Sequence, residues 1–178
     1  MKRFCELLVC AICCIGITWA LNRIYYEKVI AQIECASFLL ISKQDMKLRL
    51  INYKGDELFV TNVACGKNYG SKKKKGDMKT PEGVFHIADI QNASEWNHDF
   101  QDGKGKIEGA YGPYFIRLNV PGHKGIGIHG THDSLSIGTR VTEGCIRLQN
   151  VELERLVRLL KVPMTVVITP SAKDEQYN

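Results

Sequence analysis

From position 37 onward the chain consists of short apolar runs separated by turn residues. Met46, Leu48 and Leu50 alternate with Lys47 and Arg49, which is the period-2 pattern of a strand with one buried face. Further runs of strand length occupy residues 37–41, 58–64, 84–87, 114–118 and 164–169. So many short strands predict a mostly β domain, either a sandwich or a partial barrel.

One segment near the C-terminus has the period of an amphipathic helix instead. Asn150 is a favourable N-cap, and Glu152 and Glu154 suit the positive end of the helix dipole. The apolar residues that share one face are Leu153, Leu156, Val157 and Leu160. We therefore expect one helix packed against the β domain, followed after the last strand by a polar, frayed tail at 171–178.

Two loops are long enough to carry function. Residues 66–80 form a polar, lysine-rich segment. The strands expected at 84–87 and 114–118 are separated by about 25 residues, which is longer than most structural connections. Because binding and catalytic residues are often placed on such loops, we expect the second one to form a flap over an active site.

The N-terminus combines two positive charges with an uncharged stretch. Lys2 and Arg3 precede residues 7–22, which contain no charged side chain. A membrane-spanning helix needs about 20 apolar residues, and the core of a signal peptide needs about 7 to 15. We expect residues 1–22 to be a cleaved signal peptide or an uncleaved membrane anchor, and residues 23–35 to be a spacer helix. The domain at 36–170 would then be exported, either periplasmic or anchored to the outer face of the inner membrane.

Length and charge exclude several classes of protein. The 178 residues suffice for one compact domain with a short extension. The net charge is +5, and the run at 72–75 supplies four lysines. We expect this run to be a solvated loop, the alternative being attraction to an anionic polymer. No basic stripe with interleaved aromatic residues accompanies it, so we expect no nucleic-acid partner.

Most of the seven cysteines belong to the apolar leader. Outside that leader only Cys35, Cys65 and Cys145 remain, and they include no C-x-x-C pair. Three is an odd number, so at least one thiol stays unpaired in an oxidising compartment. An unpaired thiol in an exported protein indicates a chemical role.

The glycine-rich stretch 125–150 contains a possible nucleophile and base. His129 ends an expected strand, and Cys145 follows Gly144 sixteen residues later. A thiolate is a strong nucleophile, and an adjacent imidazole removes its proton. The backbone amides of Gly144 and Cys145 would hold the oxyanion that forms on a carbonyl substrate. Taken alone, the pattern also fits a buried structural cysteine.

A zinc site is a further alternative for the same stretch. His123, His129, His132 and Cys145 are four possible ligands. Zinc sites, however, use paired-cysteine or helical His-x-x-x-His spacings, which are missing from this stretch. We therefore expect no metal.

Several motifs in a fixed order resemble those of the L,D-transpeptidase (YkuD-type) catalytic domain. The family has a His-Gly-Thr turn, a Ser-Ile-Gly segment and a Ser/Thr-His-Gly-Cys-Ile-Arg block. The matching segments here are residues 129–131, 136–138 and 142–147, with upstream matches at 65–68, 76–83 and 112–118. The resemblance extends from about residue 38 to residue 168.

This resemblance implies a β-sandwich with a groove beside the cysteine, and a reaction on peptidoglycan. Cys145 would attack the carbonyl between an L-centred diamino acid and D-alanine in a stem peptide, with His129 as the base. The resulting thioester would pass to an acceptor amine and form a cross-link, whereas water would make the enzyme an L,D-carboxypeptidase. The implied partners are donor and acceptor stem peptides, without a cofactor.

The resemblance also points to supporting residues. Gly130 and Thr131 follow the histidine in its motif and would support the site. Arg147 would orient substrate or a loop, although an arginine here is equally compatible with a surface salt bridge.

One position departs from the family pattern. Glu143 stands where the family has histidine before Gly-Cys. A carboxylate there would raise the pKa of the Cys145 thiol, or it would pair with a cationic His129, with Arg147 or with the acceptor ammonium. We favour the pairing with His129, because carboxylates often orient catalytic imidazoles. A non-catalytic envelope-binding module is the alternative that this departure leaves open.

Overall fold

The computed structural model describes residues 17–28, 36–100, 103 and 105–178. The chain divides into two units, Met1–Ala36 and Ser37–Asn178. In the first unit residues 17–28 are helical, a range that overlaps the expected spacer helix only at 23–28, and residues 29–35 lie outside the described residues. Within the described ranges, none of the helices combines the length and apolarity required to span a membrane. The expected leader at 1–22 lies mostly outside these ranges.

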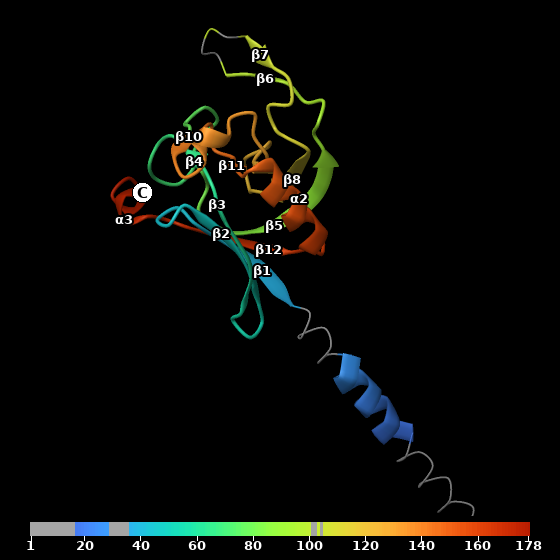
Figure 1. Cartoon of the computed structure of the whole chain (residues 1–178). Helices are drawn as coiled ribbons and strands as arrows, with labels where there is room; N and C mark the ends of the chain where they lie inside the picture. The colour runs from blue at the N-terminus through green and yellow to red at the C-terminus, as the bar shows by residue number, and fades with distance from the viewer. Residues whose placement is uncertain (1–16, 29–35, 101–102, 104) are drawn as a thin grey trace, which may run out of the picture. The chain divides into compact units, whose positions relative to one another are not determined.

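The second unit is mostly β, as predicted, and its main sheet is curled (Figure 1). This sheet has eight strands in the order β11-β9-β8-β5-β12-β1-β2-β3 among the described residues. The strands are β1 (Ser37–Ser42), β2 (Lys47–Asn52), β3 (Glu57–Asn62), β5 (Gly83–Asn92), β8 (Tyr114–Asn119), β9 (Gly127–His129), β11 (Ile146–Arg147) and β12 (Thr165–Thr169). Two small sheets pair β10 (Arg140–Thr142) with β4 (Cys65–Gly66) and β6 (His98–Asp99) with β7 (Lys106–Ile107).

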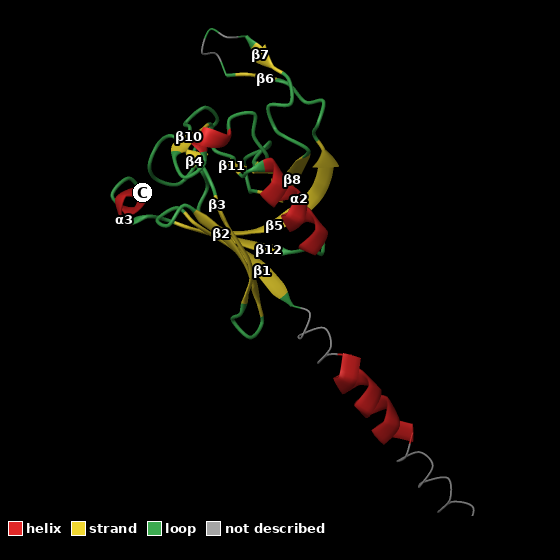
Figure 2. Cartoon of the chain, viewed as in Figure 1, coloured by secondary structure: helices red, strands yellow, loops and turns green. Residues whose placement is uncertain are grey.

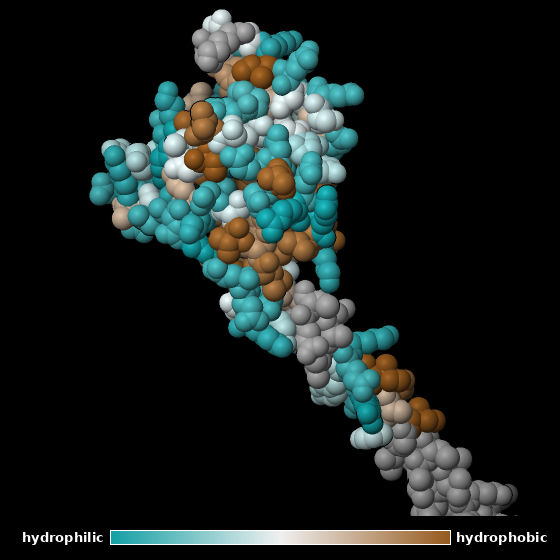
Figure 3. Space-filling model, in the orientation of Figure 1, coloured by the Kyte–Doolittle hydropathy of each residue, from teal (hydrophilic) through white to brown (hydrophobic). Residues whose placement is uncertain are grey.

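The predicted alternation accounts for the core. Leu48 and Leu50 are buried and face Ile41 and Leu39 across the β1–β2 pair. Strands β2 and β3 form a hairpin, pairing antiparallel around the turn at 52–56. On the space-filling surface, apolar side chains form separate patches among polar ones (Figure 3). The apolar side chains that the alternating pattern assigns to the interior are therefore the ones that folding removes from water.

The predicted helix is α2 (Asn150–Leu159), which lies against the sheet (Figure 2). Leu153 and Leu156 are fully buried and belong to the same core as the sheet. The predicted N-cap is wrong, because Gln149 occupies that position and makes no side-chain cap. The Asn150 side chain is used in a loop of the candidate site instead.

The C-terminal segment, expected to be a frayed tail, is folded onto the domain. It forms α3 (Ala172–Glu175), which begins with a capping box between Ser171 and Asp174. Asp174 is 0% exposed and pairs with Lys43 Nζ at 2.9 Å and with Arg140 Nη2 at 2.6 Å. A buried charge needs such partners, and the partners here come from distant segments that a local pattern does not reveal.

Removing the Asp174 carboxylate is expected to destabilise the domain strongly. Asp174→Ala leaves two buried cations without their shared partner, a kind of change that costs about 3–5 kcal/mol. Hydrogen bonds from Ser171 and the ammonium of Lys43 outweigh burial and hold the pKa of Asp174 below its usual range. The stabilisation is therefore present above the unfolded-state pKa of about 3.9 and is lost as the pH falls toward the folded-state pKa.

Denaturant unfolding at pH 7 and at pH 3 measures this effect. Glu175→Ala, which removes an exposed carboxylate from the same short helix, is the matched control and should change stability little. Equal unfolding free energies for the Asp174 and Glu175 variants at pH 7 would contradict the prediction.

Candidate active site

Strand β9 at one edge of the sheet ends with the predicted histidine, and the predicted cysteine lies one residue before the neighbouring strand β11. β9 and β11 run parallel, and Arg147 lies beside His129 in register. Cys145 comes two residues earlier, beside Gly127. Because side chains alternate between the two faces of a sheet, Cys145, His129 and Arg147 emerge on the same face. The parallel pairing of β9 with β11 thus brings two residues that are sixteen apart in sequence to neighbouring segments.

The Cys145 thiol is partly exposed and protonated at rest. Its Sγ donates to the carbonyl of Gly125 at 3.4 Å. Burial and, to a smaller extent, the nearby carboxylate of Glu143 raise the pKa of Cys145, which is about 11 with all neighbours included. The Gly127 backbone and the charges of Lys72 and Arg147 act in the opposite direction. At neutral pH the thiol therefore needs a base before it becomes a strong nucleophile.

His129 is held as a neutral imidazole with a defined tautomer. It is 4% exposed, and its Nδ1 lies 2.7 Å from the carbonyl oxygen of Gly130. A carbonyl oxygen only accepts, so Nδ1 carries the proton and Nε2 has the free lone pair. Its ring stacks on Phe115 at 5.8 Å and meets the edge of Tyr111 at 4.9 Å. Burial lowers the pKa of His129 to about 3, so Nε2 is available as a base at neutral pH.

Asn150 fixes the loop after the histidine. Its Oδ1 accepts from the Thr131 amide at 2.7 Å, and its Nδ2 donates to the Thr131 carbonyl at 3.0 Å. A Cβ added at Gly130 would lie 2.1 Å from Asn150 Oδ1, so this approach requires glycine. The Thr131 hydroxyl is engaged with the backbone of Asp133. Gly130 and Thr131 therefore shape the loop. Asn150 is a positioning residue, a role that the sequence analysis missed because it interpreted this residue as a helix N-cap.

Gly144 adopts a conformation that favours glycine. Its φ is +135°, and a Cβ there would lie 2.7 Å from the carbonyl oxygen of Lys79. Its amide donates to Thr142 Oγ1 at 3.2 Å, so it does not point into an oxyanion site as we expected. Of the two amides expected to hold the oxyanion, that of Cys145 remains.

Arg147 is a buried cation, so the alternative of a surface salt bridge is wrong. The residue is 5% exposed, and its Nη1 donates to Ser136 Oγ at 3.1 Å. Its guanidinium also lies over the ring of Phe100, 5.7 Å from the centroid. Among the described residues its Nε has no hydrogen-bond partner. Arg147 thus holds the Ser-Ile-Gly segment at 136–138 by a hydrogen bond to Ser136.

Comparisons with known proteins agree with this geometry. A model of the L,D-transpeptidase catalytic domain matches residues 36–168. The chain belongs to the L,D-transpeptidase catalytic domain family. YqjB of Bacillus subtilis is 32% identical over 134 residues, which cover 74% of this chain and 70% of YqjB. YkuD of Bacillus licheniformis is 37% identical over 133 residues, covering 74% of this chain and 65% of YkuD.

Solved structures of other proteins share the fold. The helical cell shape determining protein Pgp2 (K307A mutant) from Campylobacter jejuni superposes with a TM-score of 0.58 at 25% identity. That superposition covers 80% of this chain and 51% of the Pgp2 chain, so the protein spans about half the length of this relative. The catalytic domain of the E. faecium L,D-transpeptidase gives a TM-score of 0.55 at 17% identity, with 75% of this chain and 96% of that domain covered.

Glu143, which departs from the family pattern, contacts a histidine of the predicted flap. Its Oε2 lies 3.3 Å from Nε2 of His98, and Nδ1 of His98 lies 3.1 Å from the hydroxyl of Tyr111. His98 belongs to β6 in the long connection between β5 and β8, so this connection does reach the site. The favoured pairing of Glu143 with a cationic His129 is wrong, because the Glu143 carboxylate lies against His98 and burial lowers the pKa of His129 to about 3, which keeps its imidazole neutral.

Glu143→Gln is expected to lower the apparent pKa of the Cys145 thiol. The carboxylate opposes the thiolate charge, so removing it stabilises the thiolate. Since Glu143 is about half exposed, solvent screening limits the shift to less than about one pKa unit. Alkylation by iodoacetamide across pH 7–11 should therefore become about two- to fivefold faster below the thiol pKa. Glu154→Gln on α2 is the control, and slower alkylation of the Glu143 variant would contradict this assignment.

Part of the lysine run belongs to the site and is not solvated as expected. The side chain of Lys72 is only 6% exposed, and its Nζ lies 2.8 Å from Asp77 Oδ1. The Asp77 carboxylate also accepts the amides of Lys73, Lys74 and Lys79, and these bonds hold its pKa below the usual range although burial opposes them. The other three lysines of the run, at 73–75, are exposed. The sequence of four lysines gives no indication of which one is buried.

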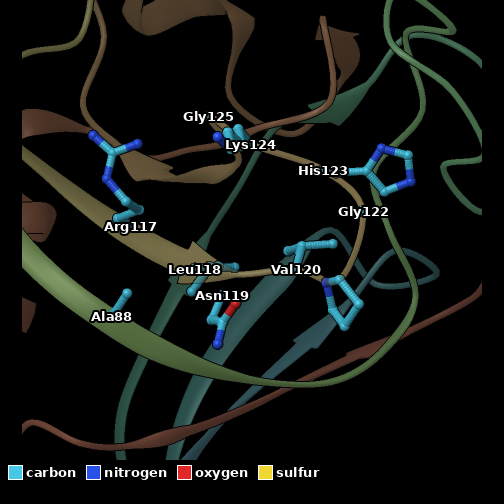
Figure 4. A pocket seen from close by; sticks show the side chains of 10 residues that line it. Ala88, Arg117, Leu118, Asn119, Val120, Gly122, His123, Lys124 and Gly125 are labelled. Carbon is cyan, nitrogen blue, oxygen red and sulfur yellow. The ribbon is translucent and has the colours of Figure 1, made fainter.

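Two pockets meet beside the nucleophile. The first, of about 530 Å³, lies between β5, β8 and the following loop, with Arg117 and His123 on opposite sides (Figure 4). Its wall includes Gly125, the acceptor of the Cys145 thiol. The second pocket, of about 470 Å³, shares residues 122–124 with it. Within the described ranges, no group of three or more His, Cys, Asp and Glu side chains is arranged to hold a metal ion.

Proposed function

We propose that this protein is a cysteine-dependent L,D-transpeptidase that acts on peptidoglycan stem peptides, with Cys145 as nucleophile and His129 as base. The observation that carries the proposal is the parallel pairing of β9 with β11, which sets His129 beside Arg147, two residues after Cys145, within the family's motifs. The partly exposed thiol and the neutral, tautomerically defined imidazole support it. Gly125, which accepts the thiol, lines the first pocket, and the second pocket shares residues 122–124 with it, so the two offer space for a peptide near Cys145.

The charge state of the pair suggests how the reaction begins. Because the Cys145 thiol and the His129 imidazole are both neutral at pH 7, the proton moves from Sγ to Nε2 as Sγ attacks the carbonyl carbon. The S–C bond forms, the C–N bond to D-alanine breaks, and the imidazolium returns its proton to the departing amine. The backbone amide of Cys145 is the donor closest to the developing oxyanion.

The second half-reaction regenerates the thiol. An acceptor amine attacks the thioester carbon, His129 takes the amine proton and returns it to the leaving sulfur, and an amide cross-link results. Water in place of the amine would give a free carboxylate. The N-terminal segment would deliver this domain to the cell envelope, as a signal peptide or as an anchor, and the domain would contact the membrane only through it.

Product analysis tests the proposed reaction. The purified full chain is incubated with a disaccharide-tetrapeptide donor and an acceptor peptide, and the products are resolved by mass spectrometry. We expect a cross-linked dimer together with one released D-alanine per bond formed. Loss of D-alanine without a dimer would identify a carboxypeptidase. A chain that forms no product and is not labelled by a carbapenem at Cys145 would be a non-catalytic binding module.

A further inference from the structure

One of the two pockets has a wall of almost uniform positive charge. It is lined by residues 72–75 and 122–124, which include five lysines and His123. Lys72 is neutralised by Asp77, and Lys73 Nζ donates to the backbone carbonyl of Asn178 at 2.9 Å. Lys74, Lys75 and Lys124 have no acidic partner among the described residues. We call this cavity the lysine pocket.

The lysine pocket lies next to the reacting thiol. Lys72 Nζ is 3.5 Å from the position that a Cβ on Gly144 would occupy, one residue before the nucleophile. On the opposite wall Lys124 precedes Gly125, whose carbonyl accepts the Cys145 thiol at 3.4 Å. Consecutive Cα atoms are about 3.8 Å apart. The backbone of Lys124 is therefore one such step from Gly125, and Lys73 is one step from Lys72, which approaches Gly144.

The positive charge of the lysine pocket favours an anionic ligand. Like charges gathered in a concave surface create a positive potential that attracts and concentrates anions. The acids near this pocket are occupied, since Asp77 binds Lys72 and backbone amides, and Glu82 binds Lys43 and Asn178. Lys74, Lys75 and Lys124 are therefore available to a ligand from outside the chain.

The proposed reaction supplies a suitable anion. Its donor peptide ends in D-alanine and so carries a free carboxylate, and the carboxylate carbon is three bonds from the carbonyl carbon that Cys145 attacks. Three backbone bonds span at most about 4 Å. We propose that the lysine pocket binds the terminal carboxylate of the donor stem peptide. This inference rests on the proposed function and assigns the specificity of the same site.

Binding of two matched peptides tests the proposal without catalysis. The full chain with Cys145→Ala is titrated with a tetrapeptide whose D-alanine carboxylate is either free or amidated. We expect the free acid to bind about tenfold more tightly, an advantage that shrinks with added salt. The double variant Lys74→Gln, Lys124→Gln removes one cation from each wall and should weaken binding of the acid to the level of the amide, while the amide is unaffected.

The double variant Lys54→Gln, Lys161→Gln is the matched control, because it removes the same charge from two exposed sites outside the pocket. It should retain the preference for the acid, and matched thermal melts exclude unfolding as the cause of any loss. Equal affinities for acid and amide in the parent, or equal losses for both peptides in the pocket variant, would overturn the proposal. Carbapenem acylation of the chain with Cys145 intact is measured separately, so that a failure of the reaction is distinguishable from a failure of the pocket.

Discussion

Cys145→Ala is expected to abolish both cross-linking and release of D-alanine, with a loss of at least about 10⁴-fold. The substitution removes the atom that forms the thioester, and neither the backbone amide of Cys145 nor His129 can replace it. Because Cys145 is partly exposed and alanine is only slightly smaller, the fold should be preserved. The measurement is the rate of D-alanine release from a tetrapeptide donor, with thermal melts of both proteins.

Cys65→Ala is the matched control for this experiment. Cys65 is fully buried, its Sγ lies 3.7 Å from the sulfur of Met46, and burial raises the pKa of its thiol. A buried, protonated thiol is inert, so this variant should lose some stability and keep its turnover. Parental turnover by the Cys145 variant would end the assignment of the nucleophile.

His129→Ala is expected to slow acylation of Cys145 by about 10²- to 10⁴-fold at pH 7. With a thiol pKa of about 11, roughly one thiol in ten thousand is ionised at that pH. In the parent the neutral imidazole takes the proton during attack, so the rate should be nearly flat between pH 5 and pH 9. In the variant only the thiolate reacts, and its rate should rise about tenfold for each pH unit.

Stopped-flow acylation by a carbapenem over this pH range distinguishes the two profiles. His132→Ala is the control, because this exposed histidine follows closely in the same loop, and its loss should leave the flat profile unchanged. If the His129 variant keeps the flat profile at the parental rate, the base is another group, and His132 would be the first to examine.

The fold followed from local patterns that involve only neighbouring residues. The alternation of Leu48 and Leu50 predicts a strand with one buried face, and the spacing of Leu153 and Leu156 predicts a packed helix. Both predictions are confirmed, because these apolar positions are buried whatever the exact partner strand is. The order of motifs around Cys145 likewise indicates the family, since it is a property of the sequence alone.

The partners of charged and polar side chains depended on the tertiary structure. Glu143 meets His98, which is 45 residues earlier and on another strand, and Asp174 meets Lys43 from the opposite end of the domain. Asn150 holds the loop after His129 although its position at a helix start predicts a cap. Sequence alone determined which faces are buried, because burial follows the local period of apolar residues. Only the packing of distant segments decided these pairs, because a charged or polar side chain takes the partner that the fold brings within hydrogen-bond distance.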